Sequence, residues 1–430
     1  MDMERNDAVY TEYVAILKRE LVPAMGCTEP IAVAYCAAKA RSILGKMPVS
    51  TELIVSGNII KNVKSVIVPN TDGARGLEAA AGIGIVAGKE ELGLEVLSQV
   101  TSEDKAAFAA WMKEERFQVR QAEDGRLLSI TVRLKDEDGK TAVAQITDAH
   151  DRIVYLEKNG EVLLDRRTAA NAEKEVGNKD AGLTVAGICE FATMADIRDV
   201  QEILDRQISY NCAISAEGLK GNYGANIGKV LLKNNADCAK TRAKARAAAG
   251  SDARMNGCEL PVVINSGSGN QGITASLPVI EYAETLGCSR EELYRALIVS
   301  NLLSVHIKSG IGCLSAYCGA VSAGASAGAG IAWLQGGRLE EIAHTIVNAL
   351  AVTSGIVCDG AKASCAAKIA IAVDAGILGY EMFRMGQQFY GGDGIISAGV
   401  EATIRNIGRL GHDGMKETDR EILNIMTCVD

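Results

Sequence analysis

The sequence predicts an α+β protein, with a large, mainly helical domain and a smaller α/β domain that contains a mixed or antiparallel sheet. Short apolar segments with strand-like alternation gather between residues 46 and 178, whereas nearly all apolar positions from about residue 180 onwards have helical spacing. The chain of 430 residues is long enough for about two or three domains. We therefore expect residues 1–45 and 179–430 to form the helical domain and residues 46–178 to form the α/β domain.

The N-terminal region is expected to form two helices joined by a tight turn. Apolar residues recur at helical spacing over residues 4–20, and Pro23 ends that helix. The segment A-M-G-C-T-E-P at residues 24–30 then leads into a second helix. Thr28 is the expected N-cap of this helix, and Pro30 suits its first turn.

The α/β region is recognised by alternating apolar segments separated by turn signals. D-G-R and E-D-G-K lie between the later segments and are typical of hairpin turns. Two helix-like stretches accompany the strands. The expected strands are residues 51–56, 63–68, 117–122, 127–134, 142–147 and 153–157, and the expected helices are residues 75–88 and 102–115.

Beyond residue 180 the sequence predicts helices almost throughout. The exception is L-P-V-V-I-N at residues 260–265, a short extended segment that leads into a glycine-rich loop. Aromatic residues make up only 4% of the chain and glycine is abundant, so the helices are expected to pack closely around small side chains. The expected helices are residues 182–206, 210–219, 225–248, 276–286, 289–308, 311–334, 339–354 and 360–378.

Charge and hydropathy exclude two classes of partner. The formal net charge is −9, and no long run of lysine and arginine provides the electrostatic footprint of a protein that binds nucleic acid. The most basic tract, residues 240–254, is rich in alanine and is expected to be a solvated helix face. The chain has neither a signal-peptide pattern nor an uninterrupted apolar run of about 18 residues, so we expect a cytoplasmic protein without a membrane partner.

Three of the twelve cysteines, Cys313, Cys358 and Cys365, lie in one stretch that is rich in glycine and alanine. Disulfides are rare in a reducing cytoplasm, which leaves buried packing, redox chemistry or metal binding. Composition alone favours packing in a helical core. The placement favours a metal, because all three are expected near helix starts, where the helix dipole stabilises thiolates, and soft thiolates suit iron–sulfur clusters or zinc.

These three cysteines have no fourth thiol or histidine at matching spacing, which favours a metal centre with one open coordination position. An open position is typical of a catalytic metal rather than a structural one. Cys318 lies five residues beyond Cys313 on the helix expected at 311–334, does not share its face well, and is assigned to packing.

The loop N-S-G-S-G-N-Q-G at residues 265–272 contains the pattern G-x-G-x-x-G. A dinucleotide site would need a second strand after the following helix, but another helix is expected there, which disfavours nicotinamide binding. The backbone N–H groups of the loop can instead hold a substrate carboxylate at a helix N-terminus, although a plain turn before a helix is about equally compatible. The candidate substrate-binding residues here are Asn265, Ser266, Gly267, Ser268, Gly269 and Asn270.

Four motifs spread over nearly the whole chain point to a family. They are G-C-T-E-P-I-A at residues 26–32, the loop at 265–272, H-I-K-S-G-I-G-C at 306–313 and C-D-G-A-K-A-S-C at 358–365. With these motifs the chain resembles the iron–sulfur serine dehydratase alpha-chain superfamily, and most closely its L-cysteine desulfidase branch. The resemblance implies a lyase that does not use pyridoxal phosphate. It also implies a catalytic helical domain that binds a [4Fe–4S] cluster through Cys313, Cys358 and Cys365.

The resemblance further implies roles for residues outside the cluster. Cys27 falls where the desulfidase pattern has a functional cysteine and where the serine dehydratases carry a histidine, which favours L-cysteine as the substrate. Cys27 is then either a general base or a fourth ligand that the substrate displaces. His306 and Lys308 would orient the carboxylate or steady developing charge. Cys428 is a poor match to the terminal cysteine that occupies the open site in some serine dehydratases.

The implied reaction is β-elimination of L-cysteine to pyruvate, ammonia and sulfide, with the open cluster iron as Lewis acid and a cysteine as base. Dehydration of L-serine is the nearest alternative. A non-catalytic cluster or thiol sensor and a nucleotide-binding oxidoreductase are alternatives of a different class. The expected partner is a small amino-acid substrate, and the many apolar helices are also compatible with a homo-oligomer.

Overall fold

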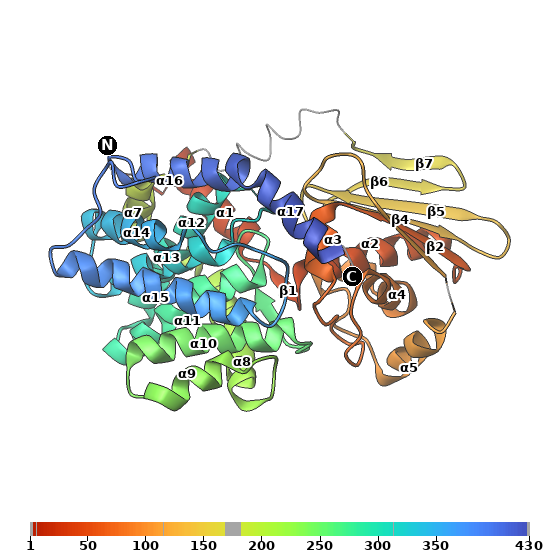
Figure 1. Ribbon diagram of the computed structural model, residues 1–430, viewed down its shortest axis with the longest axis horizontal. Coiled ribbons are helices and arrows are strands. Elements are labelled where there is room, and N and C mark those ends of the chain that lie inside the picture. Colours follow the sequence, from red (N-terminus) through yellow and green to blue (C-terminus); the bar gives the residue numbers. More distant parts are fainter. Residues whose placement is uncertain (1–2, 6, 115, 168–181, 313, 428–430) are drawn as a thin grey trace.

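The protein, seen in a computed structural model, consists of a helical lobe and a lobe that contains a six-stranded sheet (Figure 1). The structure describes residues 3–5, 7–114, 116–167, 182–312 and 314–427. The expected α+β class is confirmed, since helices dominate the described chain and a mixed sheet forms one part of it. None of the described helices combines the length and the apolar character that a membrane span requires.

The sheet has the strand order β3-β2-β4-β5-β6-β7. Its strands are β2 (Ser50–Val55), β3 (Phe117–Gln121), β4 (Ser129–Lys135), β5 (Thr141–Thr147), β6 (Ile153–Lys158) and β7 (Glu161–Asp165). β2 and β3 pair in parallel, and the other neighbouring strands are antiparallel. Alternate side chains of β2 are buried, as expected for a sheet with one face on a core.

No strand forms at residues 63–68, contrary to the sequence-based expectation. The chain there leaves α3 (Gly57–Val63) and turns, with a single bridge between Ile67 and Arg75. The valines of this run are fully buried. A short apolar run marks burial but does not distinguish a strand from a helix end that is followed by a loop.

The helix α2 (Thr28–Leu44) belongs to the sheet lobe by its contacts. It packs against β4, β5 and α4 (Leu77–Ala87), and the thiol of Cys36 lies 3.3 Å from the carbonyl oxygen of Ala144 on β5. The boundary expected after residue 45 would place this helix in the helical domain. We therefore describe α2 with the sheet lobe, and the domain boundary after residue 45 stays a prediction.

The helical lobe is built around α13 (Gly319–Leu334). The other α-helices of the described residues are α1 (Ala8–Glu20), α5 (Ser102–Trp111), α7 (Val185–Met194), α8 (Gln201–Lys220), α9 (Ile227–Asn235), α10 (Ala239–Met255), α11 (Gly269–Leu286), α12 (Arg290–Ser309), α14 (Leu339–Thr353), α15 (Cys365–Arg384), α16 (Val400–Arg409) and α17 (Lys416–Thr427). α13 packs against α11, α12, α14 and α15. A Cβ atom on Gly328 would lie 2.3 Å from the carbonyl oxygen of Gly376 on α15, so glycine allows these two backbones to touch.

Several expected helices have different bounds. Residues 182–206 contain α7 and the start of α8, and residues 225–248 contain α9 and part of α10. The helix expected at 311–334 begins only at Gly319. α12 has ended at Ser309, and Gly312 has a φ of 93°, a left-handed conformation that interrupts a helix.

A two-stranded antiparallel sheet lies at the junction of the lobes. β1 (Pro23–Met25) pairs with β8 (Pro261–Val263), which is the extended segment predicted before the glycine-rich loop. In Figure 1, β1 lies between the helical lobe and α2. Because the pairing is antiparallel, Met25 before α2 lies opposite Pro261 at the start of β8, and the end of β8 lies beside Val22. Two segments far apart in the sequence are thus held together at the junction.

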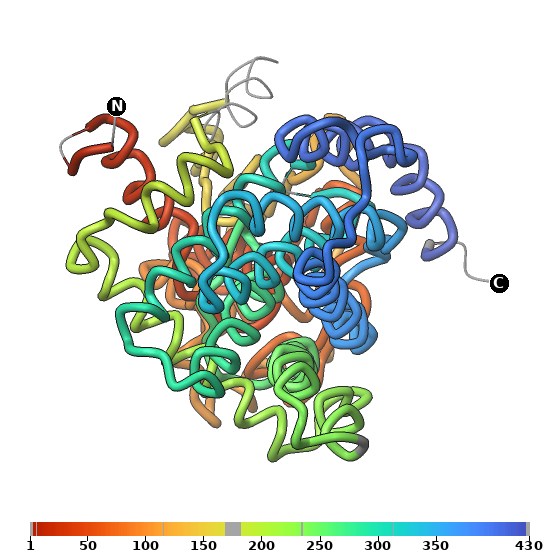
Figure 2. Tube along the Cα trace, turned by 90° about the vertical axis from the view of Figure 1, so that its left-hand side faces the viewer, coloured from red at the N-terminus to blue at the C-terminus, as the bar shows by residue number. Residues whose placement is uncertain are grey.

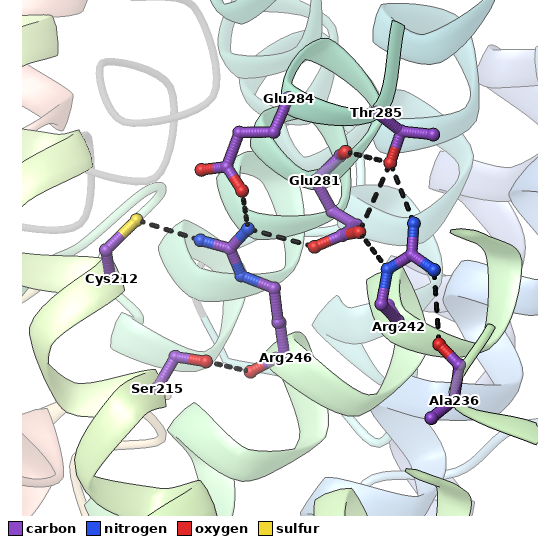
Figure 3. Close-up of polar contacts among 8 residues, drawn as sticks. All are labelled: Cys212, Ser215, Ala236, Arg242, Arg246, Glu281, Glu284 and Thr285. Atoms are coloured by element: carbon purple, nitrogen blue, oxygen red, sulfur yellow. Dashed lines mark hydrogen bonds and ion pairs between the residues drawn. The ribbon is translucent and has the colours of Figure 1, made fainter. Parts of the chain in front are cut away.

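Ion pairs tie α10 to its neighbours (Figure 3). Arg246 of α10 donates to Glu281 at 3.0 Å and to Glu284 at 2.6 Å, both on α11, and to the thiol of Cys212 on α8 at 3.3 Å. Arg242 also donates to Glu281, at 2.6 Å. Burial lowers the pKa of Arg246, but its anionic partners raise it above its ordinary value. The basic tract at 240–254 was expected to be a solvated helix face. In the structure, part of it is buried against α11, where its arginines pair with glutamates.

The C-terminal segment connects the two lobes. α16 and α17 lie on the outside of the helical lobe, and α17 reaches α3 (Figures 1 and 2). There the buried ammonium of Lys61 pairs with Asp419 of α17. This ion pair links the C-terminal helix to the sheet lobe beside the junction.

Candidate active site

A small cavity of about 100 Å³ lies at the junction of the lobes, where the N-terminal ends of four helices meet. These ends belong to α2, α11, α13 and α15. The end of α10, α3, the end of α12 and the segments before α13 and α15 also contribute to its wall. Because helix N-termini present N–H groups and a partial positive charge, the cavity favours anionic groups.

Four thiols line this cavity, those of Cys27, Cys318, Cys358 and Cys365. Cys27 is the N-cap of α2 and Cys318 is the N-cap of α13. Cys365 is the first residue of α15, and Cys358 lies on the segment before that helix, as the spacing predicts. Cys27, Cys358 and Cys365, which the sequence indicated as site residues, therefore lie on one cavity. Cys318 lies on the same cavity.

The structure places Cys318, which the sequence analysis assigned to packing, on the wall of the cavity, where it also packs against the core. Residues 314–318 do not form a helix; they run beside residues 356–358. The backbone N–H of Cys358 donates to the carbonyl of Ala316 at 2.6 Å, and the N–H of Cys318 donates to the carbonyl of Ile356 at 3.2 Å. A cysteine directly before a glycine-rich helix start, as at residues 318–319, was the signal that could have identified it.

Cys313 lies outside the described residues, and its role as a ligand stays a prediction. Leu314 and Ser315, which follow it in the sequence, line the cavity. Cys428 also lies outside the described residues.

The thiol set is chemically suited to an iron–sulfur cluster. Burial, with the neighbouring thiols of Cys358 and Cys365, raises the pKa of Cys318 to about 12, and burial raises the pKa of Cys365. A bound metal would replace the thiol protons, and the N-termini of α13 and α15 would stabilise the thiolates. Within the described ranges, no three His, Cys, Asp or Glu side chains converge as they would around a single ion. A cluster does not require this convergence, because each thiolate binds a different iron atom.

Cys27 is paired with a buried carboxylate. Its thiol, only 2% exposed, donates a hydrogen bond to Oε2 of Glu29 at 3.0 Å. Thr28 donates to the same oxygen at 3.1 Å, and Asn62 of α3 donates to Oε1 at 3.0 Å. Nε2 of His150, from the loop after β5, lies 3.9 Å from Oε1. Glu29 is therefore held by groups from both the α2 turn and the sheet lobe.

The two members of this pair have opposite protonation. Burial would raise the pKa of Glu29, but His150 and the thiol of Cys27 outweigh burial and lower the pKa to about 2. Burial and the negative charge of Glu29 raise the pKa of Cys27 well above its ordinary value. Cys27 is thus a thiol at neutral pH. It can act as a base only after it has lost this proton.

The glycine-rich loop is shared between two cavities. Ser268, Asn270 and Gln271 line the small cavity, whereas Ser266 and Gly267 line a neighbouring cavity of about 400 Å³. The loop therefore forms part of the wall between the two spaces. β8 is followed by α11 and α12 without a further strand in the described chain, so the βαβ unit of a dinucleotide site is not formed here.

Three further residues of the candidate site have different surroundings. Asn265 is fully buried and donates to the backbone and side-chain oxygens of Asn301 at 3.1 and 3.0 Å, so it attaches the loop to α12. His306 is 2.8 Å from Glu401 of α16 and is not among the residues that line either cavity. Lys308 lines both cavities, together with His150 on the larger one.

Arg254, at the end of α10, is a site residue that sequence reasoning missed. Its side chain is 1% exposed and lines the small cavity. Its Nε and Nη2 atoms have no hydrogen-bond partner within the described chain. The only sequence signal is a basic tract, and composition does not show which of its arginines is buried.

Other buried polar atoms around the cavity also lack partners in the part of the chain that the structure describes. They are Oδ1 of Asn62, Oδ1 of Asn270, Oε1 of Gln271 and the hydroxyl of Tyr317. Buried polar groups are nearly always hydrogen-bonded, so a cluster of unpartnered ones around one cavity indicates a polar ligand. The size of the cavity limits this ligand to a small molecule.

Thiols at helix N-termini and unpartnered polar groups around a small cavity define a site for a small polar molecule. The chain belongs to the serine dehydratase alpha chain family, whose model matches residues 91–424. Its relatives include UPF0597 proteins from Desulfitobacterium hafniense, 57% identical over 99% of both chains, and from Lachnoclostridium phytofermentans, 49% identical over 97% of this chain and 100% of the relative. A UPF0597 protein from Treponema denticola is 44% identical over 99% of both chains.

Membership in this family supports a lyase-like activity of the dehydratase type. Proteins of the family typically bind iron–sulfur clusters. The names of the relatives state no activity, so the substrate has to be argued from the site.

Proposed function

We propose that the protein is a lyase, independent of pyridoxal phosphate, that eliminates the β-substituent of L-cysteine and yields pyruvate, ammonia and sulfide. The observation that carries this proposal is the presence of four thiols on one small cavity that also has unpartnered polar groups. Thiols alone would suit a structural metal. Thiols beside unpartnered donors and acceptors suit a metal centre that meets a polar substrate.

The proposed cofactor is a [4Fe–4S] cluster held by three of the cysteines. Cys358 and Cys365 are two of the proposed ligands. We choose Cys318 as the third ligand, because it lines the same cavity. Cys313 remains the alternative third ligand. When bound, the cluster supplies a Lewis-acidic iron with one open position, which favours departure of a thiol or hydroxyl group.

The pair formed by Cys27 and Glu29 is proposed to handle the α-proton. Cys27 first releases its thiol proton to solvent, and the resulting Sγ thiolate accepts the proton from Cα of the substrate. The Cα–H electrons form the Cα–Cβ double bond as the Cβ–S bond breaks and hydrosulfide leaves. The aminoacrylate product then hydrolyses to pyruvate and ammonia. Alternatively, Cys27 is a fourth cluster ligand that the substrate displaces. The iron content of a Cys27→Ala variant distinguishes this role from that of a base.

The larger cavity is proposed to be the route by which substrate reaches the thiols. It is lined by Ser266, Gly267 and His150, and Lys308 borders both spaces. A cationic side chain between the two cavities would attract a carboxylate towards the helix N-termini. This arrangement gives Lys308 and the loop their proposed roles in substrate binding.

Dehydration of L-serine is the second candidate, and the family description favours it. The two reactions differ in the leaving group, and the cavity has room for a small amino acid in either case. The presence of Cys27 in the G-C-T-E-P motif supports L-cysteine, because serine dehydratases carry a histidine at the corresponding position.

The experiment that separates these candidates compares kcat/KM for both substrates after anaerobic reconstitution. Sulfide and pyruvate are measured with L-cysteine, and pyruvate alone with L-serine. We expect a higher kcat/KM for L-cysteine. A higher value for L-serine would assign the chain to dehydration, and a reconstituted cluster with no turnover of either substrate would favour a sensor.

A further inference from the structure

The arginine at the end of α10 makes no ion pair within the described residues, in contrast to an arginine earlier on the same helix. Arg246, two turns earlier on α10, is bound by two glutamates at 3.0 and 2.6 Å. Arg254 is more deeply buried, at 1% exposure, and its Nε and Nη2 atoms have no partner within the described residues. An unpaired buried charge is strongly destabilising, so its presence at a cavity indicates a group that binds an anion.

The glycine-rich loop is shaped to receive this guanidinium. A Cβ atom on Gly269 would lie 2.3 Å from Nε and 2.7 Å from Cζ of Arg254, so only glycine leaves room for it. Gly269 is the first residue of α11, and the N-cap Ser268 makes no side-chain capping bond. The guanidinium therefore lies against an uncapped helix N-terminus, and two sources of positive charge meet at one point of the wall.

The same cavity also has acceptors that suit a cation. Oδ1 of Asn62, Oδ1 of Asn270 and Oε1 of Gln271 are buried and unpartnered in the described structure, and the ionised carboxylate of Glu29 is beside them on the wall. A simple anion such as phosphate would leave these acceptors unsatisfied. A small zwitterion supplies an anionic group for Arg254 and a cationic group for these acceptors.

We infer that Arg254 binds the α-carboxylate of the substrate, with the N-terminus of α11, and that the amide oxygens of Asn62, Asn270 and Gln271 receive its α-ammonium group. This inference rests on the proposed function for the identity of the substrate as a small amino acid. It assigns the site to α-amino acids with both groups free. A planar guanidinium fork matches a carboxylate better than an ammonium group does, so lysine cannot replace Arg254 without loss.

The inference is tested by binding of L-alanine, which has both groups but no leaving group and is not consumed. Calorimetry on the reconstituted protein compares L-alanine with L-alaninamide, which lacks the carboxylate, and with propionate, which lacks the ammonium group. We expect wild type to bind L-alanine about 100-fold more tightly than L-alaninamide, and R254M to lose about 100-fold in affinity for L-alanine. R254K should lose about tenfold.

Thermal unfolding without ligand separates binding from folding. R254M should unfold at the same temperature as wild type or higher, because an unpaired buried charge is removed. The matched control R246M should unfold at a lower temperature, since it leaves Glu284 without its arginine and Glu281 with only Arg242. Iron content should be unchanged in R254M. Loss of iron with unchanged affinity for L-alanine would make Arg254 a counter-charge for the thiolates and overturn the inference.

Unchanged affinity for L-alanine in R254M and R254K, or absence of L-alanine binding in wild type, would also overturn it. Failure of the proposed reaction has a different signature. If L-alanine binds through Arg254 but neither L-cysteine nor L-serine is converted, the binding role of Arg254 stands and the reaction is wrong.

Discussion

The thiol of Cys27 and the carboxylate of Glu29 form a hydrogen-bonded pair of 3.0 Å at the N-terminus of α2. The carboxylate carries the charge and the thiol keeps its proton, because His150 stabilises the anion on one side and the anion disfavours a thiolate on the other. A buried acid–base pair with unequal protonation is a frequent feature of sites that move protons.

Replacing Cys27 with alanine should abolish turnover and leave the cluster in place. Loss of a positioned base lowers kcat by about 100-fold or more. The measurement is kcat for L-cysteine, with iron quantified in the same samples. Cys36→Ala, a change of another buried thiol on α2, is the control and should retain activity. Loss of iron in Cys27→Ala would make this residue a ligand and not a base.

Replacing Glu29 with glutamine should make Cys27 easier to deprotonate. The negative charge of Glu29 raises the pKa of this thiol, so its removal lowers that pKa. At acidic pH the reaction needs the thiolate of Cys27, so kcat/KM rises with pH as this thiolate forms. In Glu29→Gln this rise should occur at lower pH than in wild type. Glu91→Gln, on an exposed residue, should leave the profile unchanged. A limb that stays in place in Glu29→Gln would contradict the role of Cys27 as base.

Glu29 should also make stability depend on pH. Its pKa is about 2 in the folded protein, below its ordinary 4.5, so its ionisation favours the folded state at every pH above 4.5. This contribution, about 3 kcal/mol, is lost as the pH falls from 4.5 to 2. The difference in unfolding free energy between wild type and Glu29→Gln, measured in urea, should therefore be largest near neutral pH and shrink below pH 4.5. A difference that is constant with pH would contradict the assignment.

The third cluster ligand is decided by two alanine variants. We expect both Cys318→Ala and Cys358→Ala to lose iron and the visible absorption of the cluster, and Cys313→Ala to keep both. Cys288→Ala, which changes a thiol away from the cavity, is the control. Loss of the cluster in Cys313→Ala, with retention in Cys318→Ala, would restore the assignment made from the sequence.

Gly269→Ala should weaken substrate binding without unfolding the protein. The new Cβ would lie 2.3 Å from Nε of Arg254, so the guanidinium has to move away from the N-terminus of α11. A displacement of this size at a positioning group costs roughly 10- to 100-fold in kcat/KM. Gly355→Ala, where a Cβ meets no atom within 4 Å, is the matched control. Equal kcat/KM in the two variants would contradict the role of Arg254.

Local patterns predicted those parts of the fold and site that depend on neighbouring residues. The strand β8 and the hairpin between β4 and β5, at E-D-G-K, follow from spacing and turn residues. The hairpin expected at D-G-R does not form, because β2 lies between β3 and β4, and α15 begins at Cys365 and not at residue 360. The helix expected at 311–334 begins only at Gly319. The glycine- and alanine-rich stretch has helical composition throughout, but an irregular segment precedes the helix and places Cys318 on the cavity wall.

Long-range contacts account for what local patterns did not show. Arg254 is buried because β8 and the loop before α11 close over it, and Asn265 turns away from the cavity because Asn301 of α12 binds it. The pairing of Cys27 with His150 through Glu29 depends on contact between α2 and the loop after β5. No pattern within a few residues of each position contains this information.

The central claim is that the thiols at this junction hold a catalytic cluster. Its most direct test is anaerobic reconstitution of the wild-type chain, with iron, acid-labile sulfide and L-cysteine-dependent sulfide release measured on one sample. We predict a brown protein with about four iron atoms per chain that releases sulfide and pyruvate in equal amounts. A colourless protein without bound iron after reconstitution would contradict the claim.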